Sequence, residues 1–258
     1  MTTRSNRKKP SREKHPYKEI KKTESMLDKQ TMIYLSKFFN KEIISKLDFI
    51  IASGKESDIY IAESGSSDIV NGEPHVVLKF FRIESSSFFN MSDYINGDPR
   101  FVKNVGKSKA SIVATWCKKE FGNLKIAADA GVNAPKPYMY NGNILAMQFI
   151  GTDGVRAPQL KDVALSENET ETILESIIKD IGRLYRANLV HGDLSEYNIL
   201  VKEKVPYFID FGQAVMTKHP NAAVFLRRDV ANMLNYFRKR YSIKRDFDEV
   251  YKSIIAAD

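Results

Sequence analysis

The chain has 258 residues and a formal net charge of +8, and it is long enough to bury the core of one two-lobed domain or of two small ones. A hydrophobic content of 43% and a charged content of 28% lie near the averages of globular proteins, which excludes a wholly disordered, collagenous or coiled-coil chain. The sequence has no apolar run near the roughly 18–20 residues of a membrane span, and its single cysteine, Cys117, fits a reducing compartment. Residues 1–10 are polar and basic with no apolar stretch behind them, so we expect no secretory signal. We therefore expect a cytoplasmic protein without a membrane partner.

The positive charge is concentrated at the N-terminus. Residues 1–22 contain nine Lys or Arg and two Glu, so they hold +7 and the rest of the chain holds +1. Such a basic, flexible arm is either a solvated tail or a segment that binds the phosphates of RNA rather than DNA. Only Tyr17 could stack on a base, so we expect any RNA contact to be backbone-directed and sensitive to salt.

Strand and helix patterns follow one another up to about residue 150. Apolar residues at helical spacing predict a helix, or a broken pair of helices, over residues 24–46. Short β-like runs follow at 49–51, 59–61 and 75–81, with a hairpin connection at 65–72. Residues 84–108 predict a long loop, after which a helix begins near Ser108 and continues through Leu124. Residues 138–141 and 144–149 predict a further hairpin.

The pattern becomes mostly helical after a hinge at residues 151–158. Ser166 and Glu169 have the spacing of a capping box and predict a helix through Leu184. Strands followed by helices predict an α+β protein with a cleft between two lobes. We assign residues 23–150 to the N-terminal lobe and residues 151–258 to the C-terminal lobe.

The strongest chemical signal is His-Gly-Asp-Leu-Ser-Glu-Tyr-Asn-Ile-Leu at residues 191–200, followed by Ile-Asp-Phe-Gly at 209–212. Asp193, Asn198 and Asp210 flank a short apolar hairpin, which brings their side chains to one edge. Hard oxygen ligands suit Mg²⁺ that carries phosphate. We predict that Asp193 orients or deprotonates an acceptor hydroxyl and that Asn198 and Asp210 bind the metal. Turn capping explains any one of these residues, but not their joint spacing.

Two upstream segments point to the same chemistry. Lys79 lies in the middle of an apolar run, where a buried ammonium needs a partner, and Glu120 on the next helix is the predicted partner. Such a pair holds the α- and β-phosphates in kinases. Ser53, Gly54 and Lys55 form a turn that could cap phosphates through its backbone N–H groups, the hydroxyl and the ammonium. It has one glycine where the usual kinase loop has three, so a plain β-turn explains it equally well.

These segments together resemble the RIO family of atypical serine/threonine protein kinases. The resemblance covers residues 45–240 and includes Gly-Asp-Pro-Arg-Phe at 97–101, the stretch 116–124, and the motifs at 191–200 and 209–222. Gly-Asp-Pro-Arg-Phe and Glu-Phe-Gly-Asn-Leu fit the type-one, archaeal-like branch. About 48 residues precede the run at 49–51 that leads into the turn at 53–55, which is short for the winged-helix domain of the second branch. Glu-Ser-Asp at 56–58, in contrast, leans towards the second branch.

The resemblance implies a two-lobed, protein-kinase-like fold with a small β-rich N-terminal lobe and a truncated helical C-terminal lobe. It implies that Lys79 binds ATP, that Asp193 is the proton acceptor, and that Asn198 and Asp210 hold Mg²⁺ or Mn²⁺. Met147 begins a linker in which the backbone of Gln148 and Ile150 would hold adenine.

The resemblance also implies a biological role and further chemistry. It implies autophosphorylation on a serine within residues 84–111, for which we favour Ser108. It implies ATPase activity through a phosphoaspartate on Asp210, the alternative being that Asp210 only ligates Mg²⁺. The implied partner is the precursor of the small ribosomal subunit and its rRNA.

Two other functions remain compatible with the residues. Small-molecule kinases of the aminoglycoside or choline type share the His-Gly-Asp and Ile-Asp-Phe patterns, but they devote a larger C-terminal region to the acceptor than the 48 residues that follow Asp210. A non-catalytic assembly factor switched by nucleotide is the other alternative. No predicted catalytic residue is missing, which argues against a dead site.

Overall fold

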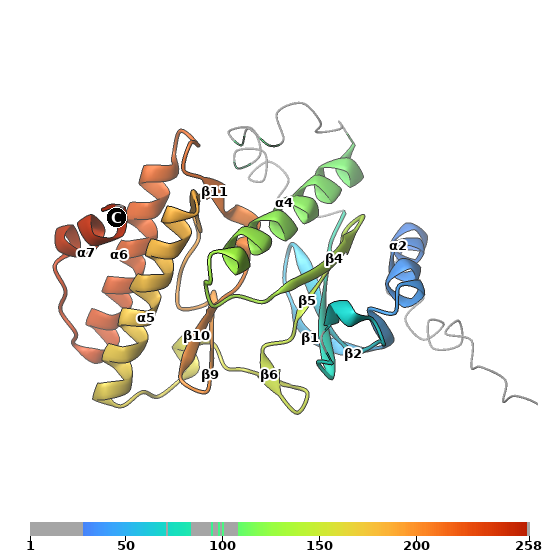
Figure 1. Cartoon of the computed structure of the whole chain (residues 1–258), viewed down its shortest axis with the longest axis horizontal. Helices are drawn as coiled ribbons and strands as arrows, with labels where there is room; N and C mark the ends of the chain where they lie inside the picture. The colour runs from blue at the N-terminus through green and yellow to red at the C-terminus, as the bar shows by residue number, and fades with distance from the viewer. Residues whose placement is uncertain are drawn as a thin grey trace, which may run out of the picture.

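The computed structural model describes residues 28–70, 72–83, 94, 98, 100 and 108–256. The basic arm at 1–22 lies outside the described residues, as does the loop predicted at 84–108 except for Tyr94, Asp98, Arg100 and Ser108. A β-sheet region and a helical region lie next to each other, which is the predicted α+β, two-lobed arrangement (Figure 1).

The first region is built on a five-stranded antiparallel sheet with the strand order β1-β2-β3-β5-β4. Its strands include the three runs and the second hairpin predicted from the sequence. Only β3 is buried along almost its whole length, because it lies in the middle of the sheet. The strands are β1 (Ile44–Ser53), β2 (Ser57–Ser64), β3 (His75–Phe81), β4 (Pro137–Asn141) and β5 (Ile144–Gln148), with the 3₁₀ turn η1 (Asp68–Val70) between β2 and β3.

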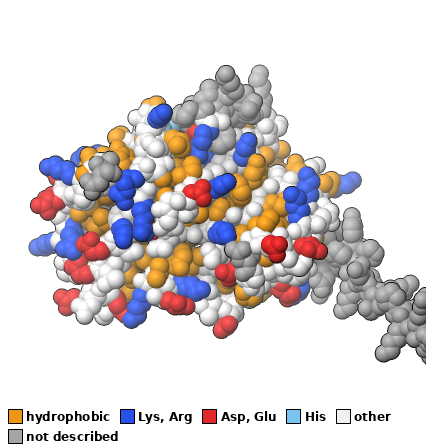
Figure 2. All heavy atoms as spheres, in the orientation of Figure 1, with side chains coloured by type: hydrophobic (Ala, Val, Ile, Leu, Met, Phe, Trp, Pro, Cys, Tyr) orange, Lys and Arg blue, Asp and Glu red, His pale blue; other side chains and the backbone are white. Residues whose placement is uncertain are grey.

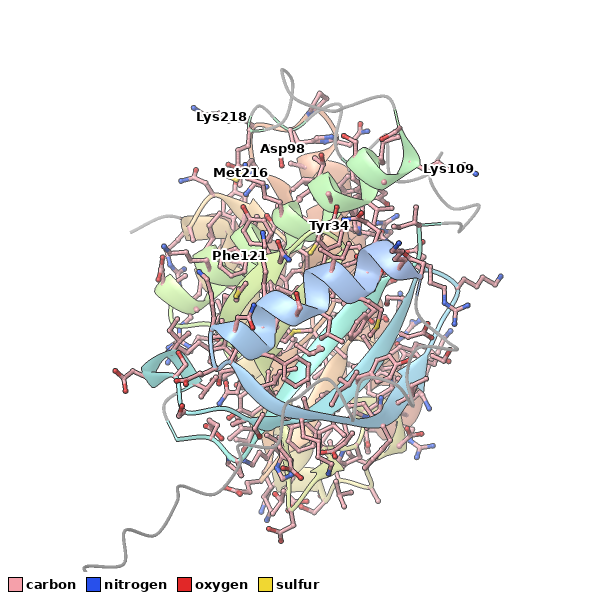
Figure 3. The ribbon with its side chains drawn as sticks, turned by 90° about the vertical axis from the view of Figure 1, so that its right-hand side faces the viewer. Tyr34, Asp98, Lys109, Phe121, Met216 and Lys218 are labelled. Carbon is pink, nitrogen blue, oxygen red and sulfur yellow. The ribbon has the colours of Figure 1, made fainter. Side chains whose placement is uncertain are left out.

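Helix α2 (Lys29–Asn40) lies across one face of this sheet (Figure 3). Asp28 caps its N-terminus by accepting hydrogen bonds from the backbone N–H groups of Gln30 and Thr31. The helix predicted over 24–46 is therefore too long, since α2 ends at Asn40 and β1 begins at Ile44. Glu42, with a φ of 53°, adopts the left-handed conformation that cannot continue a right-handed helix.

Helix α4 (Lys109–Asp129) connects the two regions (Figure 1). It begins next to Ser108, as predicted, and Ser108 caps it by accepting a hydrogen bond from the N–H of Ser111. Val113 and Trp116 belong to the hydrophobic cluster of the helical region, whereas Phe121 contacts Tyr140 of β4 with ring centroids 4.9 Å apart. The helix thus has contacts with both regions and holds Glu120 between them.

The described part of the helical region contains two helices of 20 residues, one shorter helix and several pairs of short strands. The capping box of Ser166 and Glu169 is present and opens α5 as predicted. Strands β9 and β10 form the hairpin predicted between Asn198 and Asp210. Asn198 directly precedes β9 and Asp210 follows β10, so both residues lie at the same end of the hairpin. The elements are β6 (Gly151–Thr152), β7 (Val155–Arg156), η2 (Leu160–Asp162), α5 (Glu167–Arg186), β8 (Leu189–Val190), β9 (Ile199–Lys202), β10 (Val205–Phe208), η3 (Phe211–Gln213), β11 (Val215–Met216), α6 (Ala222–Tyr241) and α7 (Phe247–Ile255).

The surface mixes charges of both signs (Figure 2). Both acidic and basic side chains occur on the face shown, in keeping with a net charge of +1 for the residues after the N-terminal arm. Among the helices that the structure describes, none is both long and apolar enough to cross a bilayer.

Candidate active site

A pocket of about 270 Å³ lies between the two regions. Residues predicted to bind nucleotide or metal line it from both sides, and apolar side chains such as Val77, Leu124, Leu200 and Ile209 form much of its wall. Of the predicted residues, the pocket lining includes Ser53, Gly54, Lys79, Glu120, Met147, Gln148, Ile150, Asn198 and Asp210. Lys55, Asp193 and Ser108 are not among the lining residues.

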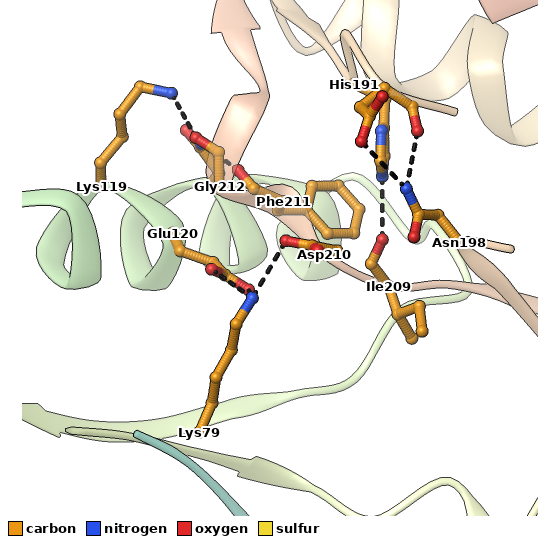
Figure 4. A network of polar contacts seen from close by, with 11 residues as sticks. Lys79, Lys119, Glu120, His191, Asn198, Ile209, Asp210, Phe211 and Gly212 are labelled. Atoms are coloured by element: carbon orange, nitrogen blue, oxygen red, sulfur yellow. Dashed lines mark hydrogen bonds and ion pairs between the residues drawn. The ribbon is translucent and has the colours of Figure 1, made fainter. Parts of the chain in front are cut away.

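The predicted ion pair between Lys79 and Glu120 is present, and Asp210 joins it (Figure 4). The Lys79 Nζ lies 2.8 Å from both carboxylate oxygens of Glu120 and 3.0 Å from Oδ1 of Asp210. Lys79 is held by β3, Glu120 by α4, and Asp210 follows β10, so one ammonium links three elements. Glu120 is buried, whereas the Asp210 side chain is 51% exposed towards the pocket.

The charges in this trio depend on one another. Burial opposes the charged form of Lys79, but the carboxylates of Asp210 and Glu120 outweigh this effect and hold the pKa of Lys79 above its ordinary value. Lys79 in turn lowers the pKa of Asp210, while burial raises the pKa of Glu120. The pocket therefore presents a charged ammonium beside an ionised Asp210.

Asp193 and Asn198 lie together at the start of the β9–β10 hairpin. The Asn198 Nδ2 donates to the backbone carbonyl of Asp193 at 2.8 Å and to its Oδ2 at 3.2 Å (Figure 4). Burial and the negative charge of Asp210 raise the pKa of Asp193, and the guanidinium of Arg228 opposes this shift. The structure thus brings Asp193, Asn198 and Asp210 together, as their spacing predicted.

Asp210 adopts a left-handed backbone conformation, with φ 64° and ψ 67°. This conformation costs energy for most residues and is tolerated best by Asn and Asp. His191 contacts the residue before Asp210, since its Nε2 lies 3.1 Å from the carbonyl oxygen of Ile209 (Figure 4). Burial lowers the pKa of His191 to about 4, so the ring is neutral and donates through Nε2 at neutral pH.

Two residues of α4 that the sequence analysis missed fix the turn η3 after Asp210. The buried Lys119 Nζ donates to the carbonyls of Gly212 and Ala214 at 2.8 and 2.5 Å. Asn123 Nδ2 donates to the carbonyls of Phe211 and Ala214 at 2.8 and 3.0 Å. Both lie in the stretch 116–124 that carries the family resemblance, but the sequence analysis assigned neither of them a role.

Asp229 on α6 is the third residue that the sequence analysis missed. Its carboxylate accepts hydrogen bonds from the backbone N–H groups of Gly192, at 2.7 Å, and Leu194, at 2.9 Å, on either side of Asp193. Arg228 also donates to the carbonyl of Gly192. A signal was available, because Asp229 lies three residues after Leu226 on the apolar face of α6, where a carboxylate is costly unless it is hydrogen-bonded.

The turn of Ser53, Gly54 and Lys55 is closed by a small polar network. The Ser53 hydroxyl donates to Oδ1 of Asp58 at 2.6 Å, and the guanidinium of Arg82 bonds to both side chains. The predicted phosphate contacts of Ser53 and Lys55 are therefore not prearranged: the hydroxyl is engaged with Asp58, and Lys55 is exposed outside the pocket lining. Gly54 lies at the pocket, where its backbone can approach a ligand closely.

The linker between the regions has some of its main-chain groups engaged. The N–H of Gln148 donates to the carbonyl of Lys136 at 2.8 Å, and the carbonyl of Ile150 accepts from the N–H of Ala157 at 3.0 Å. The Gln148 side chain points away to Glu73, with Nε2 3.3 Å from Oε1. Any contact of Gln148 with a ligand in the pocket therefore involves its backbone.

The donor set fits Mg²⁺. Asp210 and Asn198 offer a carboxylate and an amide oxygen at the pocket, and no group of three or more His, Cys, Asp or Glu in the described part of the chain forms a complete metal site. Mg²⁺ is typically held by one or two protein oxygens together with phosphates and water. The structure thus suits a metal that arrives with a phosphate ligand.

Comparison with known proteins identifies the family. The model of the RIO domain matches residues 58–250. The chain belongs to the RIO family. It is 39% identical over 236 residues to the RIO-type serine/threonine-protein kinase Rio1 of Haloferax volcanii, covering 92% of this chain and 78% of that one. It is 43% identical over 185 residues to Rio1 of Thermoplasma acidophilum, covering 72% and 96%. Such relatives confirm the type-one branch and a RIO-type serine/threonine kinase.

A solved RIO kinase has the same fold. The Rio2 kinase of Chaetomium thermophilum, in complex with ADP, Mg²⁺ and a phosphoaspartate, aligns with a TM-score of 0.66 at 23% identity, covering 88% of this chain and 67% of that one. At this identity the likeness extends to the fold alone. The two-lobed, kinase-like architecture expected from the sequence is thereby confirmed.

Proposed function

We propose that this RIO-family chain transfers the γ-phosphate of ATP, with Mg²⁺, to serine hydroxyls of protein, including its own, and that it hydrolyses ATP in the same site. The observation that best supports this function is the convergence of Lys79, Glu120 and Asp210 on one edge of a pocket that also contains Asn198. Family membership favours a protein kinase over a small-molecule kinase.

Each part of the nucleotide has matching groups in the pocket. The apolar walls around Val77, Leu124 and Leu200 suit adenine, which the Gln148 carbonyl and the Ile150 N–H would hold at its edge. Lys79 is charged and Glu120 already fixes its side chain, so it would lose little conformational entropy when it binds the phosphates. The backbone at Gly54 would cover the phosphates.

Asn198 and Asp210 would hold Mg²⁺, which neutralises charge on the phosphates when it is bound. Asp210 is suited to this role because Lys79 keeps it ionised at neutral pH. Asp193 would accept the proton of the acceptor hydroxyl as the oxygen attacks the γ-phosphorus and ADP leaves. The N–H groups that Asp229 orients keep Asp193 in place.

A second route would use Asp210 itself as the nucleophile. Its carboxylate oxygen would attack the γ-phosphorus, ADP would leave, and water would then cleave the acyl phosphate. Hydroxylamine separates the routes, because it cleaves acyl phosphates but not phosphoserine. With Ser→Ala changes across 84–111, ³²P that hydroxylamine releases supports the phosphoaspartate. Resistant label, or none during ATP hydrolysis, leaves Asp210 as a metal ligand only.

Ser108 is the proposed site of autophosphorylation. Its exposed hydroxyl caps α4, the helix that contains Glu120. A phosphate at a helix N-terminus is favourable, so the modification would reinforce the start of α4. Mass spectrometry after incubation with ATP and Mg²⁺ tests the site, and phosphate found only outside 84–111 would contradict it.

The kinase function is tested on the purified chain with γ-³²P-labelled ATP. We expect label on the protein and release of ADP, both abolished by removal of Mg²⁺ with EDTA and by Lys79→Met. Binding of nucleotide without label or ADP release in the wild type would instead support the non-catalytic assembly factor. The proposed physiological setting, a cytoplasmic precursor of the small ribosomal subunit, rests on the basic arm and on the resemblance.

A further inference from the structure

A second hollow lies beside the loop that contains Asp193, separate from the pocket between the two regions. It has a volume of about 520 Å³ and is lined by Ser195 and Glu196, which follow Asp193 by two and three residues, and by side chains of α6. The helix contributes Asn232, Asn235, Lys239 and Arg240. None of these residues has a role in the chemistry described above.

Hydrogen bonds connect the helix that lines the hollow to the loop that contains Asp193. The Asn232 Nδ2 donates to the carbonyl of Leu194 at 3.1 Å. Asp229, one turn earlier on α6, fixes the N–H groups of Gly192 and Leu194, and the Tyr236 hydroxyl donates to the carbonyl of Leu160 at 2.9 Å. A group bound in the hollow is therefore held at a defined place relative to Asp193.

The charge of the hollow favours an anion. Lys239 and Arg240 are exposed, and neither forms an ion pair with another residue of the described part of the chain. Glu196 is the one carboxylate in the lining, and the side-chain amides of Asn232 and Asn235 add neutral hydrogen-bonding groups. Two cations against one carboxylate leave a net positive charge in a concave, polar surface, which attracts acidic groups.

We propose that this hollow recognises an acidic side chain of the protein acceptor, close in sequence to the hydroxyl that is phosphorylated. The proposal rests on the kinase function proposed above, since it places the acceptor beside Asp193. A polypeptide is favoured over RNA because the only aromatic residue in the lining, Tyr236, is partly buried and its ring already packs against Phe237 and Tyr241, which leaves little of it for stacking on a base. The hollow would thus select acceptors by charge.

The test compares peptides that differ only beside a single serine, which is flanked by Glu in one peptide and by Gln in the other. Phosphorylation by the full chain gives kcat/KM, and fluorescence anisotropy of labelled peptides gives binding without chemistry. The test variant is Lys239→Glu with Arg240→Glu. The matched control is Lys179→Glu with Lys252→Glu, an equal charge change at exposed sites on α5 and α7. Binding of a fluorescent ATP analogue reports on the nucleotide pocket in every variant.

We expect the wild type to prefer the Glu peptide in both assays. In the test variant, the ratio of the Glu peptide to the Gln peptide should fall about tenfold, the size of effect that two solvent-exposed charge contacts produce. The control variant should keep the preference, and all variants should bind the ATP analogue equally. Equal use of both peptides by the wild type would overturn the proposal, as would a mixed-sequence RNA oligonucleotide that binds through Lys239 and Arg240 while neither peptide does. Preferential binding of the Glu peptide without phosphorylation of any peptide would contradict the kinase function but not the acidic specificity.

Discussion

Asp193 and Asp210 have identical side chains, but their surroundings shift their pKa values in opposite directions. Burial and the charge of Asp210 raise the pKa of Asp193, whereas Lys79 lowers the pKa of Asp210. Pairs of carboxyl groups whose pKa values are driven apart commonly divide roles in this way. Asp193 is thus the better proton acceptor, and Asp210 the better ligand for a cation.

This separation predicts the pH dependence of phosphotransfer. Asp193 must be ionised to accept a proton, so activity should fall on the acid side as pH drops through its raised pKa. Arg228 favours the ionised form of Asp193, so Arg228→Met should raise that pKa further and move the acid limb to higher pH. Profiles of kcat/KM against pH measure the shift, with Arg227→Met as the neighbouring control. An acid limb that stays in place in Arg228→Met would contradict the assignment.

The ion pair of Lys79 predicts that stability and nucleotide binding can be separated. Lys79→Met leaves the buried Glu120 without its cation and should lower the free energy of unfolding by about 3–5 kcal/mol. A second change, Glu120→Leu, removes the unpaired carboxylate and should restore much of that stability without restoring ATP binding. Urea unfolding and titration with a fluorescent ATP analogue provide the two readouts. ATP binding that recovers together with stability would show that Lys79 is only structural.

At the scale of elements, α4 connects the nucleotide pocket to the turn after Asp210. Glu120 contacts Lys79 on one side, while Lys119 and Asn123 hold the carbonyls of η3 on the other. Asn123 Oδ1 also accepts a hydrogen bond from Arg100, 2.8 Å away, and Arg100 is paired with the buried Asp98. The position of Asp210 therefore depends on α4 and on this part of the Gly-Asp-Pro-Arg-Phe segment.

Asn123→Ala should weaken metal binding through Asp210. The change leaves the buried carbonyls of Phe211 and Ala214 with fewer donors, at a cost of about 1–3 kcal/mol in stability. Because the turn then holds Asp210 less firmly, the Mg²⁺ concentration for half-maximal activity should rise. Lys118→Ala, at an exposed position of the same helix, is the control. Loss of stability with an unchanged Mg²⁺ dependence would mean that Asn123 does not position Asp210.

The sequence predicted best those elements whose local pattern and tertiary packing agree. The capping box of α5, the β9–β10 hairpin and the apolar run of β3 were all found because their periodicity or turn chemistry is local. The end of α2 was not, because Ile43 and Leu47 continue the helical spacing although they belong to the strand side of the boundary. The backbone reversal at Glu42 depends on packing that the pattern does not contain.

Some polar contacts within the site could be predicted from the sequence and others could not. Lys79 and Glu120 could be paired from the sequence because a lysine in an apolar strand requires a partner. The contacts of Lys119 and Asn123 could not be predicted, because their partners are backbone carbonyls of η3, about 90 residues away. Every residue has a backbone carbonyl, so the residue types do not indicate which one is bound. Asp229 was accessible in principle as a carboxylate on an apolar helix face.

At the scale of the whole molecule, the charge distribution separates an arm from a nearly neutral folded part. If the arm contacts rRNA, deletion of residues 1–22 should weaken binding to small-subunit precursor particles and flatten its dependence on salt, since fewer counterions are released. Affinity measured over a series of KCl concentrations gives the slope. A variant in which the lysines and arginines of residues 1–22 are changed to glutamine keeps the length of the arm and removes its positive charge, so it shows whether the effect of the deletion comes from charge. An unchanged slope after deletion would leave the arm as a solubilising tail.

The central claim is that the pocket between the two regions performs phosphotransfer with Asp193 as the base. The most direct measurement compares wild type and Asp193→Asn for binding of a fluorescent ATP analogue and for transfer of ³²P from γ-labelled ATP to a serine peptide. We predict nearly equal binding and a roughly 10²–10⁴-fold lower rate of transfer in the variant, the usual effect of a positioned general base. Transfer at the wild-type rate by Asp193→Asn would contradict the account.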